Sequence, residues 1–353
     1  MQKFYRKRMQ LSTGNRLRSF DILKLFAIFL VLWGHCIQYF LSSEPVDEPL
    51  YRTIYAFHMP LFMMISGYFA ASSMHIRLND FLKKKSVQLL LPCLTWGILI
   101  SFLIRPALDS SFIDSLLHSF RGGFWFLKSC FICYLIAFLG YRCNLKRGTR
   151  IVLTLFFSQV IPFYQVHLMY PAFLLGLELN NSPEMMRKLK SVYPIIVLSF
   201  IVLLCFWDKS FWFSPDLKEA IINRDPYPLL EYGYKRTYRI IIGIAGSLSF
   251  IFLFRKLFDK DSIPKFFEIC SSWGQYTLGI YILQSYIIEV LLARYLNFDH
   301  LNFYLFNFIV APSISIIILI VCVFIIKAIH KSPVCAFWLL GKFPRRTNHC
   351  PNK

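Results

Sequence analysis

Long apolar runs recur along the whole chain, and they constrain its fold more than any other feature. A transmembrane helix needs about 20 predominantly apolar residues, and a helix satisfies its backbone polar groups internally, as lipid requires. Runs near this length lie at 20–40, 54–74, 87–104, 124–141, 151–163, 168–179, 192–207, 237–254, 273–292 and 304–329. We therefore expect an all-α, polytopic membrane protein of about ten transmembrane helices.

The composition supports a lipid environment. Of the 353 residues, 56% are hydrophobic and only 16% are charged, whereas soluble domains carry about 25% charged residues. The net charge of +20 comes from short basic clusters between the apolar runs and not from one basic face, so we predict no nucleic-acid partner. No phosphate-binding loop or zinc motif is present, and we expect no metal.

The basic clusters alternate with acidic, mixed or very short loops, as the positive-inside rule requires. Lys and Arg gather at the N-terminus, at the C-terminal tail and at 77–85, 142–150, 187–190 and 255–265, whereas the loops 42–49, 105–123, 164–167, 208–235 and 293–303 alternate with them. We therefore predict that both termini are cytoplasmic. Residues 1–335 form the predicted membrane domain and 336–353 a short basic cytoplasmic tail.

The longest predicted outer loop, 208–235, contains prolines, aromatic residues and mixed charge. Such a loop either caps a functional site or is a partly ordered interfacial segment. The sequence leaves both interpretations open.

Ionisable side chains inside membrane spans are costly, so each one is a candidate functional residue. The first span contains Asp21, Lys24 and His35. Eleven residues of α-helix place Lys24 and His35 on nearly the same face, roughly 16 Å apart along the axis. Taken alone, Lys24 is explained almost as well by snorkelling to the cytoplasmic headgroups.

A second histidine, His58, lies in the second predicted span. The two spans run antiparallel, so His35 and His58 reach similar depths near the outer surface. A single membrane histidine is commonly a packed residue bonded to a neighbouring helix. Two histidines at matched depth, one of them on the face that carries Lys24, favour a functional site.

Three further charged residues, Lys128, Arg239 and Glu289, fall in the outer halves of their predicted spans. They are candidates for binding an acceptor molecule. An ion pair between helices, such as Glu289 with Arg239, explains them equally well. Ser66 and Gly67 are small residues that we expect to allow close helix packing.

Several separated motifs resemble one known family. FDILKLFAIFLVLWGH, FHMPLFMMISGYF, KKKSVQLLLPCLTW, FWFLKSCFICYL and YTLGIYILQSYII are similar to the integral-membrane acyltransferase family 3, which includes O-antigen and capsule O-acetyltransferases. In its first-helix pattern a basic residue precedes a histidine by ten intervening positions, as Lys24 precedes His35. Many members carry Arg at the position of Lys24 and often His at the position of Gln284.

The resemblance implies an enzyme of the bacterial cytoplasmic membrane that moves an acyl group, commonly acetyl, from cytoplasmic acyl-CoA to a hydroxyl of a cell-surface glycan or its lipid-linked precursor. His35 would act as general base or transient acyl carrier, and His58 would orient it, stabilise charge or share the proton transfer. The anionic donor would meet Lys24 and Asp21. The acceptor would meet a group of outer residues: Lys128, Arg239, Glu289 and Trp125.

Two other function classes remain open. Ten spans with intramembrane charge are also typical of a transporter or flippase for a lipid-linked glycan. Such a transporter would contain paired broken helices and inverted repeats. No convincing repeat is evident in the sequence. A non-catalytic subunit of a glycan-assembly complex is the third class, and it would neither bind nor hydrolyse acyl-CoA.

Overall fold

The computed structural model describes residues 17–108, 114, 123–213, 227–259 and 263–343, and this part of the chain contains helices and no strand. The α-helices are α2 (Arg18–Phe40), α3 (Pro49–Tyr68), α4 (Leu78–Lys85), α5 (Leu91–Leu108), α7 (Trp125–Arg142), α8 (Arg147–Val160), α9 (Val166–Asn181), α10 (Pro183–Ser191), α11 (Tyr193–Cys205), α13 (Tyr227–Phe258), α14 (Lys265–Trp273), α15 (Thr277–Ser285), α16 (Phe303–Leu305), α17 (Ala311–Ile329) and α18 (Pro333–Leu340). Three π-helical segments are η3 (Ser86–Leu90), η7 (Tyr286–Leu291) and η9 (Phe306–Val310). The 3₁₀ turns are η1 (Pro45–Asp47), η2 (Ala71–His75), η4 (Phe163–Gln165), η5 (Lys209–Trp212), η6 (Gly274–Tyr276) and η8 (Leu292–Arg294).

All ten predicted apolar runs coincide with helix over most of their length, which confirms the prediction of an all-α membrane protein. Among the described helices, six are long and apolar enough to cross a bilayer, or seven if the bent pair α10 and α11 counts as one span. Helices α8 and α9 have only 14 and 16 residues, which at 1.5 Å per residue is less than the roughly 30 Å core. The number ten and the cytoplasmic termini stay predictions.

One predicted boundary differs from the structure. Helix α13 begins at Tyr227, so residues 227–235, expected in the outer loop, are helical. The apolar run starts ten residues later, at 237. A hydropathy pattern detects only the apolar part of a helix. It does not detect a polar extension of the same helix.

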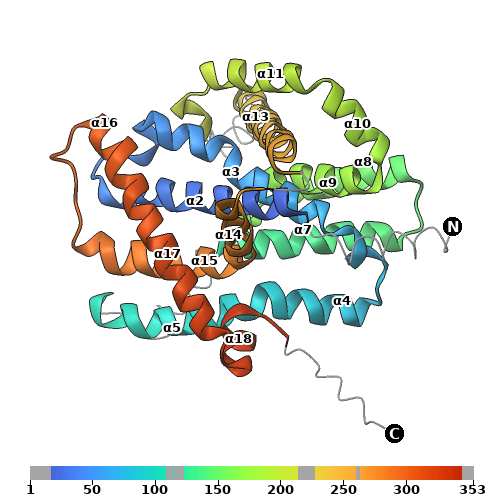
Figure 1. Ribbon diagram of the computed structural model, residues 1–353. Helices are drawn as coiled ribbons and strands as arrows, with labels where there is room; N and C mark the ends of the chain where they lie inside the picture. The colour runs from blue at the N-terminus through green and yellow to red at the C-terminus, as the bar shows by residue number, and fades with distance from the viewer. Residues whose placement is uncertain (1–16, 109–113, 115–122, 214–226, 260–262, 344–353) are drawn as a thin grey trace, which may run out of the picture.

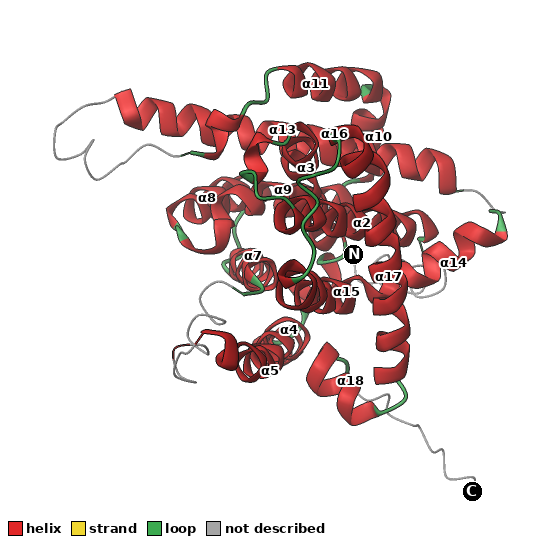
Figure 2. Ribbon diagram, turned by 90° about the vertical axis from the view of Figure 1, so that its left-hand side faces the viewer, coloured by secondary structure: helices red, strands yellow, loops and turns green. Residues whose placement is uncertain are grey.

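Helix α2 lies in the middle of the bundle, with α11 on one side and α4, α5 and α18 on the other, as both views show (Figures 1 and 2). Its neighbour α3 packs closely on α9 through two glycines. A Cβ at Gly67 would lie 1.9 Å from the Phe173 carbonyl oxygen, and one at Gly176 would lie 1.9 Å from that of Met64. Only a hydrogen atom fits at these positions, which confirms Gly67 as a packing residue.

Segments predicted to be cytoplasmic contact one another at one end of the bundle. The Arg142 guanidinium, in the basic segment 142–150, donates to the carbonyl of Ile76 at 3.0 Å, and Ile76 directly precedes the basic segment 77–85. Ser19 at the start of α2 donates to Asp259 after α13. These contacts agree with the predicted alternation of the loops.

The predicted outer loops contact one another as well. The Ser42 backbone N–H donates to the Asp299 carboxylate at 2.8 Å. Lys209 forms an ion pair with Asp47 at 2.7 Å. The segment 42–49 therefore contacts both 208–213 and 293–303. It follows the C-terminal end of α2, the end nearer to His35.

Candidate active site

A cavity of about 500 Å³ lies where α2, α3, α9, α13 and α15 approach one another. We call it the histidine cavity. Five of the eight predicted site residues line it, and they come from separate elements: His35, His58, Trp125, Arg239 and Glu289. The structure therefore brings together residues that lie up to 254 positions apart in the chain.

His35 faces Glu289 across this cavity. Nδ1 of His35 lies 3.5 Å from Oε1 of Glu289, an ion pair when the histidine is protonated. The same Nδ1 makes no hydrogen bond within the described part of the chain. The hydroxyls of Tyr39 and Ser285 lie beside the Glu289 carboxylate. These two hydroxyls therefore stabilise the Glu289 carboxylate that faces His35.

The position of Glu289 depends on an irregularity in its helix. It belongs to η7, a π-helical segment that directly follows α15. A π turn takes one more residue per hydrogen-bonded ring than an α turn, so it re-aims the side chains that follow, and such turns are frequent at functional sites. The sequence periodicity of an ordinary α-helix does not predict this placement.

His58 is almost completely buried, and its protonation pattern follows from one contact. Nδ1 lies 2.8 Å from the carbonyl oxygen of Ile54. A carbonyl only accepts hydrogen bonds, so Nδ1 carries a proton, and in the neutral ring Nε2 presents its lone pair. The ring of Tyr55 packs edge-on at 4.4 Å and holds the imidazole orientation.

Gln284 adds a buried polar group next to His35. Its amide nitrogen donates to the Tyr281 carbonyl at 3.2 Å and to the Ser285 hydroxyl at 3.0 Å. Its Oε1 has no hydrogen-bond partner among the described residues. Buried polar atoms are normally paired, and the polar group next to Gln284 is the imidazole of His35.

The outer wall of the histidine cavity is aromatic. The Tyr51 and Tyr55 rings stack with centroids 3.9 Å apart, and Trp212 lies 5.9 Å from Tyr55. The guanidinium of Arg239 sits 5.2 Å from the centre of the Trp212 ring. The sequence left open whether the loop 208–235 caps a functional site or is an interfacial segment. Trp212 lines the cavity and therefore supports the capping interpretation. Residues 214–226 of that loop lie outside the described residues.

Arg239 and Glu289 do not form the ion pair that the sequence left open as an alternative. Within the described chain, Glu289 pairs with His35 and Arg239 contacts Trp212. Both side chains nevertheless line the same cavity. They are therefore available to a ligand there.

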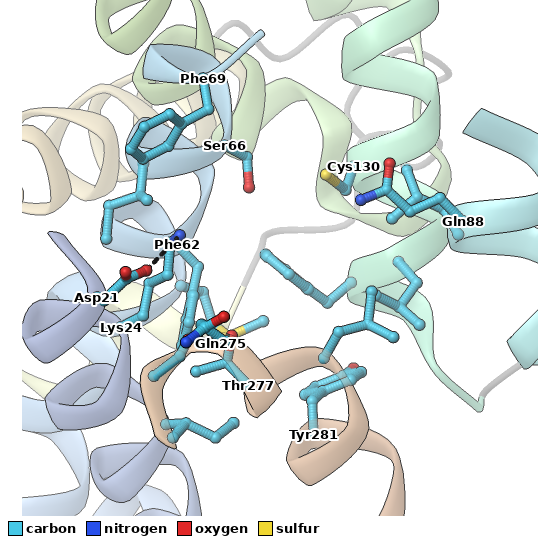
Figure 3. Close-up of a pocket in the computed structure, with 18 of the residues that line it drawn as sticks. Asp21, Lys24, Phe62, Ser66, Phe69, Gln88, Cys130, Gln275, Thr277 and Tyr281 are labelled. Atoms are coloured by element: carbon cyan, nitrogen blue, oxygen red, sulfur yellow. Dashed lines mark hydrogen bonds and ion pairs between the residues drawn. The ribbon is translucent and has the colours of Figure 1, made fainter. Parts of the chain in front are cut away.

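A second cavity, of about 410 Å³, lies nearer to the N-terminal end of α2 than the first. We call it the lysine cavity. Asp21 and Lys24 line it and form an ion pair at 3.4 Å. Figure 3 shows this pair on one wall, Cys130 and Gln88 on the opposite wall, and Tyr281 at the lower edge of the view. The ammonium of Lys24 also lies 4.7 Å from the centre of the Phe69 ring.

The two cavities adjoin along α2. Met59 and Tyr281 line both of them. On α2, Lys24 and Ile28 face the lysine cavity and Val31 and His35 face the histidine cavity, at the i, i+4, i+7, i+11 spacing of one helix face. The polar stripe predicted from the sequence therefore runs past both cavities.

Lys128 is the predicted site residue that the structure places elsewhere. It is absent from the linings of the two cavities, and its ammonium lies 5.0 Å from the centre of the Tyr164 ring. Conversely, sequence reasoning missed a set of cavity residues whose only signal is their aromatic or amide character: Gln38, Tyr39, Tyr51, Tyr55, Trp207, Trp212 and Tyr281.

The arrangement suits proton transfer to and from a hydroxyl. A histidine with a carboxylate on one ring nitrogen presents its other nitrogen to a reacting group, which is the logic of an activated nucleophile. Hydrogen bonds in the absence of substrate are often long and tighten on binding. No cluster of three or more metal-ligating residues occurs in the described part of the chain.

Residues 17–327, most of the chain, match the family described as an acyltransferase domain. The helical membrane fold and this match define the class of protein as an integral-membrane acyltransferase. The chain belongs to the acyltransferase domain family, as its motifs predicted.

Two curated relatives carry the same name. The chain is 38% identical over 136 residues to the nodulation protein NolL of Mesorhizobium japonicum and 33% identical over 144 residues to the nodulation protein NolL of Sinorhizobium fredii. These segments cover 35% and 37% of this chain and 36% and 38% of the relatives. The chain thus spans little more than a third of the length of the relatives it matches. No solved structure matches the chain.

Proposed function

We propose that the chain is an O-acyltransferase that moves an acyl group, in the simplest case acetyl, from cytoplasmic acyl-CoA to a hydroxyl of a cell-surface glycan or its lipid-linked precursor. The observation that carries the proposal is the pair of adjoining cavities along α2. One contains the cation Lys24, and the other contains His35 and His58. A donor and an acceptor that approach from opposite ends would meet between them.

The donor enters from the end where the predicted cytoplasmic segments gather. The ammonium of Lys24 attracts the anionic donor and donates hydrogen bonds to its pantetheine arm, while Asp21 holds the ammonium in place. The arm lies in the lysine cavity and presents its thioester past Met59 and Tyr281, the residues common to both cavities.

In the reaction, Nε2 of His35 removes the proton of the acceptor hydroxyl. The oxygen then attacks the thioester carbonyl carbon. A carbon–oxygen bond forms, the carbon–sulfur bond breaks, and His35 returns the proton to the departing CoA sulfur. Glu289 orients the ring and stabilises the imidazolium that forms. The lone pair of His58 Nε2 accepts a hydrogen bond from a neighbouring hydroxyl of the glycan and so aligns the acceptor.

The acceptor lies against the aromatic wall. Flat aromatic faces pack on the C–H faces of sugars, and Tyr51, Trp125 and Trp212 present such faces to the cavity. Arg239 binds the polar or anionic groups of the glycan, because its guanidinium offers five donors in a fixed geometry. We assign the protein to the bacterial cytoplasmic membrane, in keeping with the rhizobial relatives.

The bent pair α10 and α11, at 67°, is the single broken helix found among the described candidate spans. A transporter of the kind considered above would have a pair of broken helices in corresponding positions. The observation therefore gives the flippase hypothesis little support. Glycan crossing the membrane without consumption of acyl-CoA would favour that hypothesis over acyl transfer.

The test is an acyl-transfer assay with the purified protein, labelled acetyl-CoA and a glycan extract from the source cells. We expect labelled glycan from the native protein and a loss of at least about 10³-fold with His35→Ala. Trapping of a labelled protein intermediate would identify His35 as an acyl carrier instead of a general base.

His300→Ala is the matched control, because His300 is an exposed histidine in an outer loop. It should leave transfer unchanged. Full transfer by His35→Ala at normal abundance would refute the mechanism, and absence of transfer by the native protein with every glycan fraction would refute the function.

A further inference from the structure

A third cavity, of about 250 Å³, opens at the predicted cytoplasmic end beside the C-terminal segment. It is walled by α4, η6, α17 and the chain after α18. Its lining includes Lys84, Tyr276, His330 and Lys342. Three of the residues in its wall, Gln88, Gln275 and Leu278, also line the lysine cavity.

The three cavities therefore form one series. The C-terminal cavity adjoins the lysine cavity, and the lysine cavity adjoins the histidine cavity through Met59 and Tyr281. Charge changes along the series. The C-terminal cavity contains two lysines, and the lysine cavity contains one lysine paired with an aspartate. The histidine cavity contains His35 and His58.

The position of Lys342 is fixed by the backbone. Helix α18 ends at Gly341, which has a φ of +62°, and a Cβ there would lie 2.3 Å from the Val87 carbonyl oxygen. Only glycine accepts both the left-handed conformation and the close approach. The backbone N–H of Lys342 donates to the Ala336 carbonyl at 3.1 Å. Lys342 is thus held against η3 at the cavity mouth.

The side chains at this mouth suit a phosphorylated ligand. Nδ1 of His330 contacts the Ile326 carbonyl at 2.7 Å and so carries a proton, which leaves Nε2 to accept from the Lys342 ammonium at 2.6 Å. An ammonium has three protons, and Lys342 and Lys84 both offer charge-assisted hydrogen bonds to phosphate. The Lys342 ammonium also lies over the Tyr276 ring, 5.6 Å from its centre, which helps to hold the charge at the mouth of the cavity.

We infer that the C-terminal cavity binds the adenosine 3′,5′-bisphosphate end of acyl-CoA through Lys84 and Lys342. This inference rests on the proposed function. The nucleotide lies at the cavity mouth, the pantetheine arm passes into the lysine cavity, and the thioester reaches the histidine cavity. His330 and Lys342 lie beyond residue 327, where the family match ends, so this part of the site belongs to the chain's own C-terminal segment.

The experiment compares two donors, acetyl-CoA and S-acetylpantetheine, which lacks the nucleotide. The double variant Lys84→Ala/Lys342→Ala should raise the KM for acetyl-CoA by about tenfold or more and leave the KM for S-acetylpantetheine unchanged. Lys83→Ala/Lys331→Ala is the matched control, because both lysines are exposed neighbours that do not line the cavity. It should change neither KM.

A second measurement is equilibrium binding of adenosine 3′,5′-bisphosphate to the full chain in nanodiscs of zwitterionic lipid. Native protein and the control should bind it, and Lys84→Ala/Lys342→Ala should lose the binding. This binding measurement does not require acyl transfer. It therefore tests the nucleotide site even if the proposed function is wrong.

Two results would overturn the inference. One is unchanged KM and unchanged bisphosphate binding in the Lys84→Ala/Lys342→Ala variant. The other is an equal rise of KM for both donors that depends on the anionic lipid content of the vesicles, which would show that the lysines bind a lipid headgroup phosphate.

Discussion

The lysine cavity and the histidine cavity share one face of α2 but differ in the groups that line them. The lysine cavity has a single charged pair, Asp21 and Lys24, among largely apolar side chains. The histidine cavity gathers His35, His58 and Glu289 with an aromatic wall. A cavity that guides a flexible arm needs shape and one anchoring charge, whereas acid–base chemistry needs several convergent polar groups. Under the proposed function, the lysine cavity therefore guides the pantetheine arm and the histidine cavity performs the chemistry.

Removal of the Glu289 carboxylate from the histidine cavity should have the largest effect. Glu289→Gln keeps the shape of the side chain but loses the charge that stabilises the imidazolium of His35. We expect kcat to fall by about 10²-fold with little change in the KM for acetyl-CoA. Steady-state kinetics with the purified variant measure the split.

Glu289→Asp is the conservative companion of that variant. It retains the charge and should retain more activity than Glu289→Gln. If Gln and Asp variants were equally active, or if their main effect were on KM, Glu289 would have a structural or binding role and not a positioning one.

A change in the lysine cavity should act on the donor instead. Lys24→Ala is expected to raise the KM of both acetyl-CoA and S-acetylpantetheine about tenfold, because it removes a charge-assisted hydrogen bond to the arm common to both. Lys24→Arg keeps the charge and should act more weakly. A fall in kcat without a change in either KM would contradict the assignment of donor binding to the lysine cavity and of the chemistry to the histidine cavity.

The smallest effect is expected at the aromatic wall of the histidine cavity. Trp212→Ala should raise the KM for the glycan acceptor about fivefold, the size of one aromatic contact, and leave the KM for the donor unchanged. The control is Trp338→Ala, an exposed tryptophan on α18 that lines none of the three cavities. A donor effect at Trp212 would contradict the acceptor assignment.

Much of the fold was predictable, because the apolar runs mark the helices that lipid requires. The placement of Lys24 and His35 on one face of α2, and of His58 in the same cavity as His35, was predictable for a similar reason. Helix geometry fixes the face and depth of a residue on a regular helix, and charged groups in lipid are rare enough to stand out.

The remainder depends on local irregularities and on packing. The contact of His35 with Glu289 follows from the π turn η7, which a regular helical period does not reveal. Trp212 reaches the cavity from a loop, and loops carry no period at all. Lys128 shows the converse, since its predicted depth was suitable but its side chain lies over Tyr164.

The central claim is that donor and acceptor reach one site from opposite sides of the membrane. The most direct test encloses labelled acetyl-CoA in proteoliposomes and supplies a membrane-impermeant glycan acceptor outside. We expect labelled glycan outside while CoA stays inside, and no labelled glycan with His35→Ala. Transfer that occurs only when donor and acceptor are on the same side would contradict it.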